Sequence, residues 1–158
     1  MGIYAWDMTL IRRRGMATEH NTALVVAAAL SAIAALLHVG IVIGGAQRYR
    51  FFGAGERMAS AAAAGRLYPT IVTLGIATVL ALWSAYALSG AGIIAPLPWL
   101  QWALITITGI YLARGLAIVP LLLFARSHST PFLLWSSLVC IVYGAVHLLG
   151  LSQVWAIL

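Results

Sequence analysis

Four apolar stretches, each about 20 residues or longer, constrain this chain more than any other feature. They lie at residues 22–45, 68–88, 99–124 and 131–156 of a chain of 158 residues. A hydrocarbon core about 30 Å thick needs about 20 apolar residues per helix, so these stretches leave room only for short connections. The sequence therefore predicts an all-α fold, an integral membrane bundle of four transmembrane helices.

Composition argues against a water-soluble domain. Hydrophobic residues make up 63% of the chain and charged residues 8%, whereas soluble domains carry roughly 25% charged residues. The formal net charge is +6, with arginine in place of lysine throughout. In a chain this apolar, arginine marks cytoplasmic loops and contacts with headgroups. We expect a bilayer with anionic lipids as the partner, and no nucleic acid.

The chain before the first apolar stretch has a different character. Residues 1–21 mix polar and apolar side chains, and Met16 offers a second start, so residues 1–15 are either native chain or an upstream extension. Arg12, Arg13 and Arg14 resemble the start of a signal peptide, but the apolar stretch that follows exceeds the roughly 7–15 residues of a signal-peptide core. We expect an N-terminal segment, residues 1–21, and one transmembrane domain, residues 22–158.

The distribution of arginine predicts the orientation. The connections after the first and third spans contain Arg48, Arg50, Arg57, Arg66 and Arg126. No charged residue occurs at residues 89–98 or after residue 147. Because cytoplasmic loops are enriched in Arg and Lys, we expect a multi-pass protein of the bacterial inner membrane with loops one and three in the cytoplasm and both termini periplasmic or external.

The loop between the first and second spans carries the most motif-like pattern. Its arginines surround aromatic residues, and two glycines precede an Ala-rich run that predicts a short interfacial helix. Glycines before a helix can turn backbone amides toward an anion. This predicts a ligand or lipid-headgroup site made of Arg48, Arg50, Gly53, Gly55, Glu56, Arg57 and Arg66. The alternative is a surface loop that meets lipid phosphates nonspecifically, with Glu56 paired to Arg57 or favouring a helix N-terminus.

Ionisable side chains within the spans are further candidates, because each costs about 2.5 kcal/mol or more in a bilayer. Helix rise places Arg114 about 15 Å from either end of the third span and His147 at a similar depth on the fourth. We expect an intramembrane polar cluster of His38, Tyr111, Arg114, Tyr143 and His147. This cluster is either a structural clamp between the last two spans or a ligand or proton site.

Two features predict the local geometry of the spans. Gly40 and Gly44 are four residues apart, which favours the close approach of another helix, from this chain, a second copy or a membrane protein partner. Pro120 predicts a kink near the far end of the third span.

Several kinds of chemistry find no support in the sequence. Cys140 is the single cysteine, which excludes an intrachain disulfide or a cysteine metal cluster. No Walker loop, HExxH, CxxC or nucleophile elbow occurs, and no Asp or Glu lies within a span. His38 and His147 are predicted about 10 Å apart in depth, which argues against shared ligation of one haem. We expect no cofactor, no metal and no catalytic residue.

Two resemblances extend over much of the chain after Met16. The segments "GGAQRYRFFGAGERMA", "YPTIVTLGIA", "YALSGAG" and "YLARGLAIVP" resemble small four-span bacterial inner-membrane proteins of unassigned function. The stretch "GERMASAAAAGRLYPTIVTLGIA" is similar in layout to the MAPEG glutathione and eicosanoid membrane enzymes, with Ala and Gly where those enzymes carry Asn and Glu before the proline. The second likeness implies a trimer that binds glutathione through Arg57 or Arg114.

The favoured hypothesis is non-enzymatic binding or organising of lipid-like molecules or a membrane protein partner through a cytoplasmic Arg and aromatic collar. One alternative is a MAPEG-like glutathione-dependent membrane enzyme. Another is a small transporter or proton-coupled exporter, for which only His38 or His147 would supply a gate that titrates near neutral pH.

Overall fold

The computed structural model of this protein describes residues 20–124 and 130–157. Its helices, in the order of the chain, are α2 (Thr22–Phe51), α3 (Glu56–Ala63), α4 (Tyr68–Gly90), α5 (Leu100–Leu116), α6 (Ile118–Phe124), α7 (Pro131–Val154) and the 3₁₀ turn η2 (Trp155–Ile157). Within these residues, four helical segments are long and apolar enough to cross a membrane, with α5 and α6 together forming the third. The predicted all-α membrane bundle and its short helix after the first span are confirmed.

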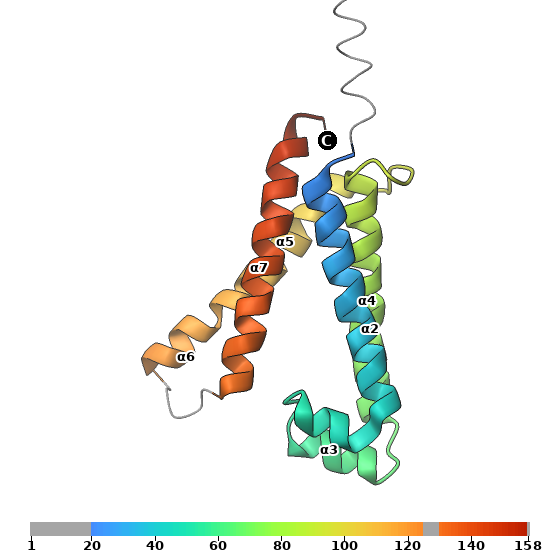
Figure 1. The fold of residues 1–158 in the computed structure, drawn as a ribbon, viewed down its shortest axis with the longest axis vertical. Helices are drawn as coiled ribbons and strands as arrows, with labels where there is room; N and C mark the ends of the chain where they lie inside the picture. Colours follow the sequence, from blue (N-terminus) through green and yellow to red (C-terminus); the bar gives the residue numbers. More distant parts are fainter. Residues whose placement is uncertain (1–19, 125–129, 158) are drawn as a thin grey trace, which may run out of the picture.

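Two antiparallel helix pairs build the bundle (Figure 1). Helix α2 packs beside α4, and α5 packs beside α7. The pairs meet at the end of the molecule where α2 begins, here called the meeting end, and diverge toward α3 and α6. A buried cluster at the meeting end holds the two pairs together and consists of Leu24, Ala91, Leu104, Leu151 and Val154.

Asn21 fixes the start of the first span. Its side-chain oxygen accepts a hydrogen bond of 2.8 Å from the backbone N–H of Leu24, which caps α2. Its backbone N–H donates to the Ala91 carbonyl at 3.2 Å, and its side-chain amide donates to Gln153 at 2.9 Å. One residue therefore ties the beginning of α2 to the ends of α4 and α7.

Close helix contacts between α5 and α7 are made at two glycines that the sequence did not single out. A Cβ added to Gly115 would collide with Ile141 of α7, and one added to Gly144 would collide with Leu112 of α5. In contrast, the Cβ position of Gly40 has nothing within 4 Å, and the three atoms nearest to that of Gly44 all belong to Arg48 of its own helix. The expected approach of another helix at Gly40 and Gly44 is therefore not made within the described chain.

Two of the spans bend. In α2, Gly45 has φ 62° and ψ −154°, so the helix continues to Phe51 in a new direction and does not end at Gly45 as expected. In the third span, α5 ends at Leu116, four residues before Pro120. A proline ring cannot donate to the carbonyl four residues earlier and clashes with it. The predicted kink is confirmed, and it lies one turn before the proline.

Helix α3 packs back onto α2 and α4. Ile41 and Tyr49 of α2 form a buried cluster with Ala59 of α3. The Tyr49 hydroxyl donates to Thr73 of α4 at 3.1 Å. This packing fixes the loop that carries most of the described arginines at one end of the bundle, called here the α3 end.

Candidate functional site

Four arginines with their aromatic neighbours surround the α3 end, and we call this set the collar. Arg48 and Arg50 close α2, Arg57 lies on α3, and Arg66 lies in the turn before α4. The aromatic members are Tyr49, Phe51, Phe52 and Tyr68. Five charged residues of the first loop were predicted to form a site. The collar contains four of them, the arginines, and the fifth is Glu56.

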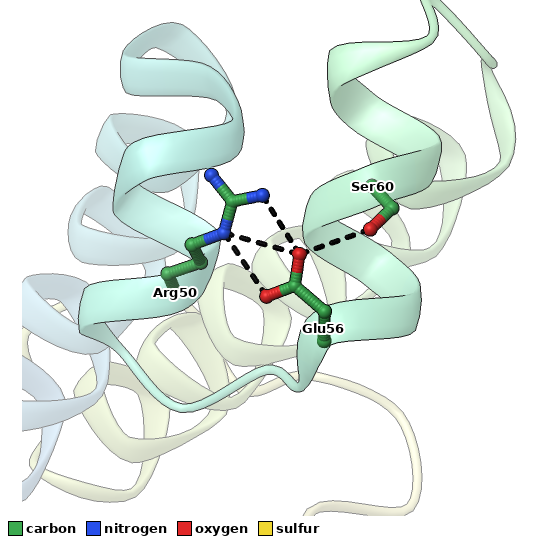
Figure 2. Close-up of polar contacts among 3 residues, drawn as sticks. All are labelled: Arg50, Glu56 and Ser60. Carbon is green, nitrogen blue, oxygen red and sulfur yellow. Dashed lines mark hydrogen bonds and ion pairs between the residues drawn. The ribbon is translucent and has the colours of Figure 1, made fainter.

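Arg50 and Glu56 form an ion pair that closes the loop between α2 and α3 (Figure 2). The Arg50 guanidinium donates to both carboxylate oxygens, with distances of 2.7 to 3.2 Å, and the Ser60 hydroxyl donates to the same carboxylate at 3.0 Å. These hydrogen bonds, from Arg50 first and then Ser60, lower the pKa of Glu56 to about 2. The charge of Arg50 is therefore matched within the loop, and Glu56 pairs with Arg50 where Arg57 was the expected partner.

The two loop glycines lie at the helix ends: Gly53 follows the last residues of α2, and Gly55 is the N-cap of α3. Gly53 has φ 61°, its N–H donates to the Arg50 carbonyl at 3.1 Å, and the Ala54 N–H donates to the Tyr49 carbonyl at 3.0 Å. This is the Schellman arrangement that ends a helix with a left-handed residue. A side chain on Gly53 would also collide with the Phe132 ring of α7. The Gly53 and Ala54 amides are thus already used in the cap of α2.

Arg57 and Arg66 border an open hollow of about 520 Å³ on the outside of α3. The other lining residues are Ser60, Ala61, Ala64 and Tyr68. Among the described residues, neither arginine forms an ion pair, because the described carboxylate, Glu56, is held by Arg50. Two guanidinium groups beside the hydroxyl-bearing Tyr68 suit an anion with several oxygens, such as a phosphate.

Arg48 faces a different part of the surface. It borders a second hollow, of about 230 Å³, together with Phe52 and four residues of α2. The seven predicted site residues of the first loop therefore divide into three groups: the Arg50 and Glu56 pair, the two capping glycines, and three arginines that face two separate hollows.

The centre of the bundle holds an aromatic cluster around Tyr111. The Tyr111 ring lies 5.5 Å from that of Tyr143 and 5.1 Å from that of His147, centroid to centroid. Trp83 of α4 packs on the same ring at 4.9 Å, and the Tyr111 hydroxyl hydrogen-bonds the Ser31 hydroxyl at 3.1 Å. The sequence predicted three of these residues together. Ser31 and Trp83 were missed, because a small hydroxyl and an apolar ring give no distinct signal in an apolar helix.

His147 is completely buried in this cluster. Its Nδ1 is 2.8 Å from the Tyr143 carbonyl one turn earlier in α7. Its Nε2 has no hydrogen-bond partner among the described residues. His38 makes the same contact with its own helix, Nδ1 to the Ala34 carbonyl at 2.7 Å, and no hydrogen bond joins it to the Tyr111 cluster.

Arg114 lies outside the Tyr111 cluster, in contrast to the predicted arrangement. Its guanidinium donates to the Ser136 hydroxyl at 2.9 Å and to the Ser137 hydroxyl at 3.4 Å. Ser136 is the sixth residue of α7, so this level is about 8 Å from the start of that helix at 1.5 Å per residue. The expected depth of about 15 Å counted the third span as one straight helix, and the break after Leu116 removes that premise.

The described residues contain no group of three or more His, Cys, Asp or Glu side chains that could hold a metal ion. Comparisons with known protein families, with curated proteins and with solved structures find no match for this chain.

Proposed function

We propose that this membrane protein binds anionic lipid headgroups through the collar, without chemistry of its own. The observation that carries the proposal is the hollow on α3, where Arg57 and Arg66 face outward without an acidic partner in the described part of the chain. Tyr68 adds a hydroxyl group at its wall, while the Ser60 hydroxyl donates its hydrogen bond to Glu56. The hollow lies at the end of the spans, which is where phosphate groups are found in a bilayer.

The charge balance of the collar supports the same ligand. Between residues 48 and 66, four arginines and one glutamate leave an excess of three positive charges. Each arginine near an anionic membrane surface contributes about 1 kcal/mol of attraction. Arginine also binds phosphate with two parallel hydrogen bonds, which a lysine cannot do.

The proposal includes the orientation of the protein. With the collar in the cytoplasm, loops one and three meet the anionic leaflet of a bacterial inner membrane, and the meeting end faces the periplasm. Single cysteines introduced at exposed positions Ala64 and Ala95, in a Cys140→Ser background, test this orientation. We expect a membrane-impermeant maleimide added to spheroplasts to label residue 95 and to leave residue 64 unlabelled.

Headgroup binding is tested by replacing the two arginines of the α3 hollow with glutamine. The detergent-solubilised protein is titrated with phosphatidylglycerol, and native mass spectrometry measures the bound lipid. Loss of two contacts of about 1 kcal/mol each predicts roughly 30-fold weaker binding for Arg57→Gln/Arg66→Gln. Arg50→Gln/Glu56→Gln is the matched control, since it changes the same loop without changing net charge. Unchanged affinity in the first variant, or an equal loss in the control, contradicts the proposal.

A glutathione-dependent enzyme is the second candidate, because two arginines and a tyrosine around one hollow also suit a ligand with two carboxylates. It requires retention of the protein on a glutathione resin, lost in Arg57→Gln, and a trimer in native mass spectra. A monomeric protein that is not retained on the glutathione resin would exclude the enzyme.

A further inference from the structure

The second hollow lies on an exposed face of α2. Ile33, Leu36, Leu37 and Gly40 have the three- and four-residue spacing of a single helix face, and they line one side of the hollow. Leu36 is 70% exposed and Ile33 is 51% exposed. The buried residues Ser31 and Ala35 lie on the opposite face, which packs in the bundle.

The bend at Gly45 supplies the other wall. Beyond it, α2 changes direction, and Arg48 and Phe52 close the hollow at the α3 end. Gly40 forms the floor, where a Cβ would meet nothing within 4 Å. The stem of Arg48 lies across Gly44, where any side chain would displace it. Three glycines thus produce a hollow that is apolar along its length and has a guanidinium at one end.

We infer that this hollow seats one acyl chain of an anionic phospholipid whose phosphate is bound by Arg48. The inference rests on the proposed binding of anionic lipid by the collar and adds a second site, separate from the Arg57 and Arg66 hollow. It assigns to Gly40 and Gly44 a role in binding lipid, where the sequence suggested helix packing.

The geometry fits a phospholipid in a bilayer. Gly40 and Arg48 are eight residues apart, at most about 12 Å along a helix. One leaflet of the hydrocarbon core is about 15 Å thick, half of about 30 Å. A lipid with its phosphate at Arg48 therefore places its acyl chain along α2 and over Gly40.

Charge complementarity distinguishes a lipid from a second copy of the chain. Arg48 forms no ion pair within the described residues, and a protein helix docked on this face would have to bring an acid to it. The acid that the structure describes, Glu56, is held by Arg50 and Ser60. A second collar with its own excess of arginine would repel the first. A phosphodiester supplies the missing negative charge, and its acyl chain fills the apolar part.

The test uses nitroxide-labelled lipid in phosphatidylcholine vesicles that contain the protein. Electron paramagnetic resonance measures the motionally restricted fraction of phosphatidylglycerol labelled on an acyl chain, with labelled phosphatidylcholine as the neutral reference. Gly40→Leu fills the floor of the hollow. Gly75→Leu is the matched control, because Gly75 lies within α4 and its Cβ position also has nothing within 4 Å.

We expect the restricted phosphatidylglycerol fraction to fall in Gly40→Leu to the part held by the Arg57 and Arg66 hollow, and to stay at the wild-type value in Gly75→Leu. Arg48→Gln, which leaves the helix face intact, should weaken phosphatidylglycerol binding about fivefold, as loss of one arginine contact predicts. If Gly40→Leu behaves like Gly75→Leu, the acyl-chain seat is refuted.

The same experiment separates the two lipid sites. Arg57→Gln/Arg66→Gln should leave unchanged the loss of restricted phosphatidylglycerol that Gly40→Leu causes. If that double variant abolishes the restricted signal and Gly40→Leu does not, the seat on α2 is refuted and the headgroup proposal stands. If Gly40→Leu and Arg48→Gln abolish all lipid retention and the double variant changes none of it, the seat on α2 stands and the proposal for the α3 hollow fails.

Discussion

Gly115 provides the sharpest test of how the helix pair α5 and α7 is packed. In Gly115→Ala, the new Cβ would lie 2.5 Å from Ile141 Cγ1, 2.9 Å from the Ile141 backbone nitrogen and 3.0 Å from the Ser137 carbonyl oxygen. Two of these three atoms belong to the backbone of α7, so rotation of a side chain cannot relieve the clash. The helices must separate locally, and overpacking of this kind costs about 1–3 kcal/mol.

Gly109 of the same helix supplies the matched substitution. Its Cβ position has nothing within 4 Å. Replacing glycine by alanine inside a helix contributes roughly 0.5–1 kcal/mol of stability where space allows. Because both variants make the same chemical change in α5, this propensity contribution cancels in their comparison. We therefore expect Gly115→Ala to be about 1–3 kcal/mol less stable than Gly109→Ala.

Reversible unfolding in mixed micelles, driven by increasing sodium dodecyl sulfate and followed by circular dichroism, measures this difference in the free energy of unfolding. Equal stability of the two variants would refute the close contact between α5 and α7. Gly144→Ala should repeat the loss from the other helix, because its Cβ would lie 2.7 Å from two atoms of the Leu112 side chain and 3.1 Å from the Leu112 backbone nitrogen.

Three further outcomes are expected. Glu56 should titrate near pH 2 in ¹³C-glutamate NMR spectra and return toward its ordinary pKa of about 4.5 in Arg50→Gln. The stabilisation from this pair is present above about pH 4.5 and is lost as the pH falls toward 2. A Glu56 signal that titrates at the same pH in both proteins refutes the pair. Pro120→Ala restores a backbone N–H donor for the Leu116 carbonyl, so α5 and α6 should become one helix and the distance between spin labels at Trp102 and Leu123 should lengthen. An unchanged distance would show that Pro120 does not cause the break. A double-mutant cycle of Ser31→Ala and Tyr111→Phe should give a coupling of about 0.6 kcal/mol, as for other hydrogen bonds between transmembrane helices, and a coupling of zero would show that the hydroxyls do not interact.

The sequence was most informative where one residue type has one local consequence. Long apolar runs specify spans because unsatisfied backbone groups are not tolerated in lipid. Pro120 specified a kink because it lacks an N–H group. The Ala-rich run after Gly55 specified α3. These inferences need no knowledge of which helix packs against which.

The sequence was less informative where the answer depends on a partner. Gly40 and Gly44 have the spacing of a packing motif, yet the contacts lie at Gly115 and Gly144, because contacts between helices depend on how each helix is rotated about its axis. Arg114 was expected beside His147, but the break after Leu116 and the hydroxyls of Ser136 and Ser137 place it nearer the start of α7. The first loop has four similar arginines near one glutamate, and the sequence does not show which of them pairs with Glu56. In the structure that arginine is Arg50.

The preference of the wild-type protein for anionic lipid tests the central proposal most directly. Equal amounts of phosphatidylglycerol and phosphatidylcholine with identical acyl chains are added to the detergent-solubilised protein, and native mass spectrometry counts the lipids retained. Because phosphatidylcholine shares the phosphate but is neutral overall, the account predicts that phosphatidylglycerol dominates the bound population and that added salt reduces its excess. Equal retention of the two lipids at low salt would contradict it.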